Sequence, residues 1–459
     1  MFKHIGYALI TLLLLFSLAQ PVNSQTLIWE NNFGGMLNEM GNSCEILPDS
    51  SIIILGTTYS YGSGLADLYL VKTDYLGNPI WTREYGGDST DFGYDVQLTS
   101  DGGFIIVGNT TLNHISKDVY LVKVDSSGLV EWEKTFGGSG SDDGQSVRQT
   151  YDNGFIITGT TNSIGNGYTD TYLIKTDSLG NLEWQKTFGG AGGESGNAGR
   201  QTPDSGFVLI GSTGSFGEGY SSIFVVRTDK NGDSLWAYTY GGNRADFGYS
   251  IEVTADGGLI FVGATASFGN GESDVYLIKT DPFGNPEWDY TYGGSYDDRG
   301  YKIKELKSGN FVVTGKTESF SSSIDAYLIM TNPIGQPVWT TNFGGNLSDE
   351  GTAIAFDAEE NIIIAGKSFS YSSGGSDIFL FKVLGDQTTD VNELIVDDFL
   401  PDGFSLSQNY PNPFNLSTAI EYSIPYRAAV SLTIYNVLGQ TVSHWSANSL
   451  AAGTYRYEW

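Results

Sequence analysis

The chain has 459 residues, with 23 basic and 53 acidic side chains and a formal net charge of −30 at pH 7. That charge excludes a basic nucleic-acid-binding protein. With 61 Gly, 12 Pro and 14% aromatic residues, the composition indicates a turn-rich globular protein, because a disordered acidic chain would lack the aromatic side chains of a core. A single cysteine, Cys44, excludes an intrachain disulfide and a multi-cysteine zinc site, and three histidines leave little for imidazole chemistry.

The first 24 residues are predicted to be a secretory signal peptide. Lys3 precedes an apolar run over residues 5–19, and short side chains lead up to Ser24, after which we expect cleavage. An uncleaved anchor is the alternative, but the run is shorter than the roughly 20 residues that a bilayer span needs. We therefore expect a secreted or outer-surface protein that passes through the periplasm and has no transmembrane segment after cleavage.

A unit of about 50 residues repeats along the middle of the chain. Seven tryptophans mark it, at intervals of 52, 51, 52, 52, 52 and 51 residues: Trp29, Trp81, Trp132, Trp184, Trp236, Trp288 and Trp339. Such regular spacing is typical of a tandem structural repeat. We therefore take the region 25–383 as one repetitive domain.

Each unit contains the pattern of four strands. After the tryptophan come an aromatic-Gly-Gly sequence, a loop and an alternating segment such as 146–150. Two apolar, β-branched runs follow, such as 104–107 and 119–123, separated by a longer polar loop. An Asp-x-x-Gly turn then leads to the next tryptophan. Four short strands per unit predict an all-β, seven-bladed β-propeller, with strands a, b, c and d numbered from the centre outward.

The first tryptophan strand has no partners of its own, and the last unit lacks a fourth strand. We therefore expect Leu27–Phe33 to serve as strand d of the last blade and to close the ring, which removes exposed sheet edges.

The turn before each tryptophan carries a resemblance. The segment 177–184, Asp-Ser-Leu-Gly-Asn-Leu-Glu-Trp, resembles the tryptophan-docking repeat of quinoprotein propellers and lies where sialidase-like propellers have Asp-boxes. The resemblance implies that the tryptophan packs on the neighbouring blade. The spacing of Asp and Gly differs from the Asp-box, and quinoprotein enzymes have eight blades and a cofactor site, so the resemblance supports the fold and not an activity. The repeats are also similar to those of secreted, uncharacterised prokaryotic propeller proteins.

The C-terminal part has a different composition. Residues 384–401 are polar and acidic and indicate a linker, and residues 402–459 include the run Tyr-Pro-Asn-Pro-Phe-Asn at 410–415. This part resembles the type A C-terminal sorting domain of the type IX secretion system, a small immunoglobulin-like sandwich. The resemblance implies a bacterium of the Bacteroidetes or a related phylum, and the secretion machinery as a partner. The family pattern continues beyond the point where this sequence stops, so we expect the sorting domain to be incomplete.

Two columns of acidic residues recur in the loops. The d–a loop column contains Glu39, Asp91, Asp142, Glu194, Asp246, Asp298 and Asp349, and the column that opens strand c contains Asp67, Asp118, Asp170, Asp274, Asp325 and Asp377, with Ser222 as the exception. Both loops emerge on one face of the propeller. The carboxylates are expected to accept backbone N–H bonds. The alternative is calcium binding, for which Asp91, Asp142, Asp246, Asp298 and Asp349 are the candidates; no other cofactor is expected.

The predicted channel column on strand a varies among the units. Its members are Glu45, Gln97, Arg148, Arg200, Glu252, Lys304 and Ala355, of which Arg148, Arg200, Lys304 and Glu252 are the candidate ligand-binding residues. The cations could take an anionic group such as a uronate carboxylate, although solvated charge is the alternative. The neighbouring Cys44 is expected to be a core residue and not a nucleophile.

These features favour a binding or adhesion module over an enzyme. The alternatives are a propeller glycoside hydrolase or polysaccharide lyase, to which only the departure from the repeat at Arg148 and Arg200 points, and a structural surface-layer protein. We expect a glycan or surface-protein ligand on the face with the long d–a and b–c loops, where the three cations would serve an anionic ligand. A recurring b–c loop residue could stack on sugars or pack between blades: Tyr61, Ile164, Phe216, Phe268, Phe320 or Tyr371.

Overall fold

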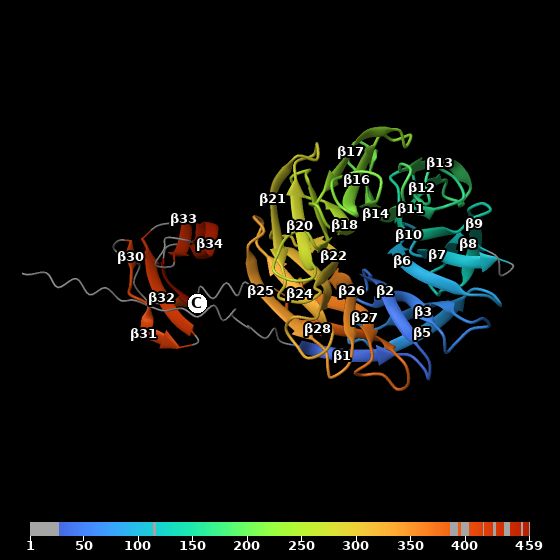
Figure 1. The fold of residues 1–459 in the computed structure, drawn as a ribbon. Helices are drawn as coiled ribbons and strands as arrows, with labels where there is room; N and C mark the ends of the chain where they lie inside the picture. The colour runs from blue at the N-terminus through green and yellow to red at the C-terminus, as the bar shows by residue number, and fades with distance from the viewer. Residues whose placement is uncertain are drawn as a thin grey trace, which may run out of the picture. The chain divides into compact units, whose positions relative to one another are not determined.

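All regular structure described by the computed structural model is β-strand (Figure 1). The described residues are 27–112, 116–385, 393–395, 404–415, 417–425, 428–435, 441–450 and 453–458. The chain divides into two units, Met1–Leu384 and Gly385–Trp459. The predicted signal peptide and most of the predicted linker lie outside the described residues. Within those residues there is no helix with the length and apolar character needed to cross a lipid bilayer.

The first unit is built of four-stranded antiparallel sheets, seven among the described residues. Six are formed by strands consecutive in sequence. They are β2 (Glu39–Ile46), β3 (Ile52–Thr58), β4 (Asp67–Thr73) and β5 (Pro79–Tyr85); β6 (Asp91–Leu98), β7 (Phe104–Leu112), β8 (Ser116–Val124) and β9 (Val130–Phe136); and β10 (Asp142–Gln149), β11 (Phe155–Thr161), β12 (Asp170–Thr176) and β13 (Leu182–Phe188). Next come β14 (Glu194–Gln201), β15 (Phe207–Thr213), β16 (Ser222–Thr228) and β17 (Ser234–Tyr240); β18 (Asp246–Val253), β19 (Leu259–Thr265), β20 (Asp274–Thr280) and β21 (Pro286–Tyr292); and β22 (Arg299–Glu305), β23 (Phe311–Thr317), β24 (Asp325–Thr331) and β25 (Pro337–Phe343).

The remaining sheet joins the two ends of the repeat region. Its order is β1 (Leu27–Phe33), β28 (Asp377–Val383), β27 (Ile362–Ser368) and β26 (Asp349–Phe356). Strand β1 pairs antiparallel with β28, with Phe33 opposite Ile378. The N-terminal tryptophan strand is thus the outer strand of the sheet that ends the repeats.

The middle strands are buried because sheets pack on both of their faces. Every residue of β3, Ile-Ile-Ile-Leu-Gly-Thr-Thr, is buried, as continuous apolar runs predict for strands covered on both faces. Side chains of neighbouring sheets form shared apolar clusters, such as Ile105 with Phe155 and Ile53 with Phe104. The core is therefore a series of layers between adjacent sheets.

The first strands of the sheets line the centre of a ring (Figure 1). Each contacts the first strand of the next sheet, and β26 contacts β2 to complete the cycle. A cluster that includes Cys44, Ile54, Ile363 and Ile378 spans this last junction. A β-bulge follows the third residue of each eight-residue first strand, as between Gly93 and Asp95, and such bulges redirect side chains.

The tryptophans pack against the following sheet, as the resemblance implies. Trp132 on β9 lies beside Gly180, in the turn between β12 and β13, so closely that a methyl group on this glycine would be 2.5 Å from Cζ3 of the indole. Gly180 also has a φ of +74°, a conformation that favours glycine. The Asp-x-x-Gly turn thus serves both the backbone and the contact between sheets.

The second unit has its own strands. A sheet has the order β29 (Glu393–Ile395), β35 (Gly453–Glu458), β32 (Ser417–Ile424) and β30 (Ser405–Leu406), with β31 (Tyr410–Asn415) also paired to β32. Strands β33 (Ala428–Tyr435) and β34 (Thr441–Leu450) form a separate pair. Tyr422 and Tyr455 stack with ring centroids 5.6 Å apart.

Candidate functional site

The four predicted ligand-binding residues come together at the centre of the ring. Arg148, Arg200, Glu252 and Lys304 line one cavity of about 20 Å³, which also touches Glu45, Asp95 and Lys302. A space of this size holds about one water molecule. The inward orientation agrees with the predicted channel column, but the cavity is too small for a sugar.

These charges lie at the opposite end of the inner strands from the long loops. Along β10, Asp142 pairs with Thr161 at the long-loop end, whereas Arg148 pairs with Ile156 beside the short turn to β11. The expectation that Arg148, Arg200 and Lys304 would serve a ligand on the long-loop face is therefore wrong. The cause is the length of an eight-residue strand, which separates its two ends by roughly 20 Å.

The guanidinium of Arg148 is already engaged by a carboxylate of the neighbouring sheet. Its Nη1 donates to Asp95 Oδ2 at 2.6 Å. Asp95 also accepts hydrogen bonds from Ser43 Oγ at 2.8 Å and from the Val147 amide at 3.1 Å. Burial alone would raise the pKa of Asp95, but the charges of Arg148, Lys302 and Arg200 lower it to about 2. The carboxylate is therefore ionised and holds two inner strands together.

A second ion pair joins Arg200 and Glu252 across the next junction. Burial opposes ionisation of Glu252, and the charge and hydrogen bonds of Arg200 overcome it, so the pKa of Glu252 is lowered. Lys302 takes no part in an ion pair within the described residues, and burial lowers the pKa of its ammonium group. The departure from the repeat at Arg148 and Arg200 thus has a structural explanation. Each arginine is the basic partner of an ion pair that joins two adjacent sheets.

Asp95 and Lys302 also line the central cavity, but the channel column predicted from the sequence does not include them. They stand two residues before Gln97 and Lys304, and side chains two apart on a strand share a face. The period-2 rule could therefore have found them. Cys44 is buried in an apolar cluster, and burial raises the pKa of its thiol to about 12, which supports the core assignment.

The d–a loop acids accept hydrogen bonds in their own loops, as expected. Asp91 accepts from the Gly87 amide at 2.8 Å, and Asp298 accepts from the Gly294 amide at 2.8 Å and from Ser319 Oγ at 2.6 Å. The same amide contact recurs at the other loops: Gly35 to Glu39, Gly138 to Asp142, Gly190 to Glu194, Gly242 to Asp246 and Gly345 to Asp349. Among the described residues, no group of three or more His, Cys, Asp or Glu side chains could hold a metal ion.

The b–c loop residues are 39–46% exposed in all six units that have one. Two of them, Phe216 and Tyr371, line grooves between neighbouring sheets. Four rings pack on an aromatic residue of strand c with centroids 5.5–5.8 Å apart: Tyr61 on Tyr69, Phe216 on Phe224, Phe268 on Tyr276 and Phe320 on Tyr327. Both earlier interpretations therefore have support, because each ring packs at one side and stays open at another.

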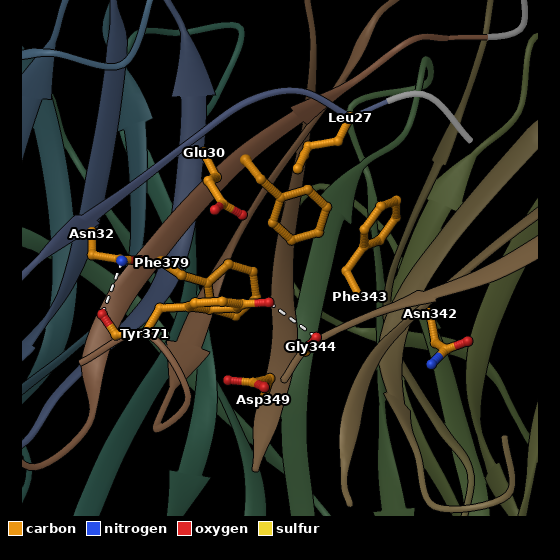
Figure 2. A pocket seen from close by; sticks show the side chains of 10 residues that line it. Leu27, Glu30, Asn32, Asn342, Phe343, Gly344, Asp349, Tyr371 and Phe379 are labelled. Carbon is orange, nitrogen blue, oxygen red and sulfur yellow. Dashed lines mark hydrogen bonds between the residues drawn. The ribbon is translucent and has the colours of Figure 1, made fainter. Parts of the chain in front are cut away.

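The two grooves lie at equivalent junctions and differ in volume. One, of about 150 Å³, is lined by Phe343, Gly344, Tyr371 and Phe379 together with Glu30 and Asn32 of β1 (Figure 2). The other, of about 550 Å³, is lined by the equivalent residues of another junction: Phe188, Gly189, Phe216, Phe224, Ala237 and Thr239. Tyr371 is held in place because its hydroxyl donates to Gly344 O at 3.0 Å and its carbonyl accepts from Asn32 Nδ2 at 2.9 Å (Figure 2).

The known proteins that this chain resembles are distant from it. No protein-family model matches the chain. An uncharacterised WD repeat-containing protein of Acanthamoeba polyphaga mimivirus is 22% identical over 409 residues, and the regulatory protein FlaEY of Caulobacter vibrioides is 27% identical over 132 residues. These matches cover 70% and 24% of this chain but only 28% and 14% of the two relatives, so the chain spans less than a third of either relative's length.

Similar solved structures include the WD40 domain of Neurospora crassa Pan2, with 9% identity, a TM-score of 0.46 and coverage of 77% of this chain and 97% of that domain. Another is the β-propeller domain of the trilobed protease of Pyrococcus furiosus, with 10% identity, a TM-score of 0.42 and coverage of 76% and 94%. The order of the sheets and the cycle of first strands identify the first unit of this chain as a multi-bladed β-propeller.

Proposed function

We propose that this protein is an exported, closed seven-bladed propeller that acts as a glycan-binding module, with its ligand in the grooves between sheets on the long-loop face. The observation that carries the proposal is the half-exposed ring that recurs at the same place in successive units. An aromatic face beside a few fixed polar groups is the usual composition of a small-molecule site.

The rings are positioned before any ligand binds. Tyr61 and Tyr371 donate their hydroxyl hydrogens to Gly34 O at 2.8 Å and to Gly344 O at 3.0 Å. Fixed rings lose little conformational entropy on binding, which favours affinity. Several equivalent grooves on one rigid ring would also let a polymer with repeated sugars bind by avidity.

A neutral glycan suits this face better than an anionic one. The chain carries a net charge of −30, and both acid columns lie beneath the long loops. The candidate cations are at the other end of the channel and two of them are paired. Long-range repulsion would therefore oppose an anionic polysaccharide at the grooves.

Calorimetric titration of the full chain with neutral oligosaccharides tests the proposal. The variant Tyr61→Ala/Phe216→Ala/Tyr371→Ala should lower the affinity for a long oligosaccharide at least tenfold, because three stacking surfaces are lost. Tyr151→Ala removes an exposed ring from a short turn on the opposite face and serves as the matched control. Binding that survives the triple change, or that is lost in the control, would overturn the assignment.

The export part of the proposal rests on the sequence of the two ends. Deleting residues 402–459 should leave the protein in the periplasm of a host that has a type IX secretion system, and fractionation with an antibody to the propeller would show where it is. If the truncated protein still reaches the cell surface or medium, the sorting role is wrong while the glycan proposal stands.

A further inference from the structure

At six of the seven junctions between sheets two carboxylates face each other, and all of these side chains are buried except Asp118, which is partly buried. One comes from the start of a third strand and the other from the start of the first strand of the next sheet. The pairs are Asp67 with Asp91, Asp118 with Asp142, Asp170 with Glu194, Asp274 with Asp298, Asp325 with Asp349, and Asp377 with Glu39. At the remaining junction Ser222 takes the place of the acid opposite Asp246.

Among the described residues, no basic side chain neutralises these pairs. None of the ion pairs of the described residues involves any of these carboxylates. Burying a carboxylate without a counter-charge is costly, and a second carboxylate of the same sign raises the cost. No positive charge among the described side chains therefore offsets these carboxylates.

The pair formed by Glu39 and Asp377 is the clearest example of two buried carboxylates without a counter-charge. Glu39 is fully buried and Asp377 is 4% exposed. A methyl group on Gly34 would collide with both Asp377 Oδ1 and Glu39 Oε2, so these two oxygens converge beside the same glycine. This glycine therefore leaves room for the carboxylates to approach.

Hydrogen bonds satisfy only part of this pair. Glu39 accepts from Thr58 Oγ1 at 2.8 Å, the Ser60 amide at 3.0 Å and the Gly35 amide at 2.8 Å. Asp377 Oδ2 accepts from the Ser373 amide at 3.1 Å, but Asp377 Oδ1 is buried without a hydrogen-bond partner. The unpartnered oxygen is the one that points toward Glu39.

We propose that these carboxylate pairs bind hard divalent cations, Ca²⁺ in particular, and that each cation ties the third strand of one sheet to the first strand of the next. Ca²⁺ accepts carboxylate, carbonyl and water oxygens in a flexible geometry, whereas Mg²⁺ demands a rigid octahedron. Because each site supplies only two acidic side chains, the affinity should be that of extracellular calcium modules, about 10⁻⁴–10⁻³ M. An exported protein would meet calcium in that range.

Calcium binding by the full chain, stripped with a chelator, is the direct test. Equilibrium dialysis should find several Ca²⁺ per chain, and the melting temperature should rise with the logarithm of calcium concentration. Asp274→Ser copies the natural Ser222 junction and should reduce the bound calcium by one ion. Asp377→Ser should do the same at the junction that closes the ring. Asp177→Ser, in an exposed turn of the opposite face, is the control and should leave the number unchanged.

Two results would overturn the proposal. One is melting curves that coincide in chelator and in millimolar calcium with no ion bound, and the other is calcium binding that Asp274→Ser and Asp377→Ser both leave unchanged. If calcium has no effect and the chelated protein loses stability as the pH rises, the pairs share a proton instead. None of these measurements involves a glycan, so the cation and the glycan proposals stand or fall separately.

Discussion

The guanidinium of Arg200 on β14 holds the carboxylate of Glu252 on β18 through two hydrogen bonds, from Nε to Oε2 at 2.8 Å and from Nη2 to Oε1 at 2.7 Å. The two side chains belong to adjacent sheets and are only 12% and 22% exposed. The pair therefore contributes to the contact between the inner strands β14 and β18 at the central cavity.

Arg200→Ala should destabilise the protein by about 3 kcal/mol or more, because it leaves Glu252 buried without its partner. Arg200→Ala/Glu252→Ala removes both charges and should cost less than the single change. Denaturant unfolding of the two variants measures the difference. A double variant that is less stable than the single one would show that the charge of Glu252 is compensated by other channel cations.

A buried lysine on the short-turn side offers a natural comparison between sheets. Lys175 contacts Asp152 Oδ2 and Glu183 Oε2, each at 3.0 Å, and its side chain is 5% exposed. In the sheet β22–β25 the equivalent residues are Ser308, Met330 and Val338, and Met330 is fully buried.

Asp152→Ser/Lys175→Met/Glu183→Val should change the free energy of unfolding by less than about 1 kcal/mol, since well-packed apolar groups can replace a buried ion pair. Lys175→Ala alone should cost more, because it also removes the packing of the lysine stem. Denaturant unfolding gives both values. Equal losses for the two variants would mean that the ionic contacts, and not the packing, dominate at this position.

Deleting residues 27–33 should lower the melting temperature substantially and promote association. The deletion exposes the backbone of β28, which pairs with β1 along its length, and unpaired strand edges recruit other chains. Differential scanning calorimetry and light scattering at several protein concentrations measure the two effects. A truncated protein that melts within a degree or two of the full chain and stays monomeric would contradict this role of β1.

Acid should destabilise the protein through carboxylates of the short-turn side. Burial by itself would raise the pKa of Asp101. Hydrogen bonds from Thr99 and the Gly103 amide, together with the charge of Lys123, outweigh burial and lower this pKa to about 2. At a given pH in this range the unfolded state then binds more protons than the folded state. The contribution of Asp101 to stability is therefore present above its ordinary pKa of about 3.9 and is lost as the pH falls toward about 2.

Asp101→Asn should therefore be less stable than the wild type at pH 7, and the difference should close between about pH 4 and pH 2. Urea unfolding at a series of pH values follows it. The raised pKa values of Asp274 and Asp377 act in the opposite sense, because a group with a raised folded-state pKa stabilises the fold below that pKa and ceases to do so as the pH rises. A difference between Asp101→Asn and wild type that is constant with pH would contradict the assignment.

The repeat could be predicted from the sequence because each unit must satisfy the same local demands. A tryptophan that docks on the next turn, a glycine such as Gly180 at positive φ, and apolar runs buried on both faces are properties of short segments. Their spacing is visible without any knowledge of contacts. The inward column on the first strands followed in the same way, since alternation along a strand is local.

What only the tertiary structure decided are the relationships between sheets. Asp95 and Arg148 are 53 residues apart in the sequence. They are in contact only because the ring brings their strands together. The pairing of Asp377 with Glu39 joins opposite ends of the propeller, and no local pattern distinguishes that contact from a loop hydrogen bond. Charge partners, the end of the channel that carries the cations and the open faces of the b–c rings all depend on packing between distant segments, which a sequence period cannot encode.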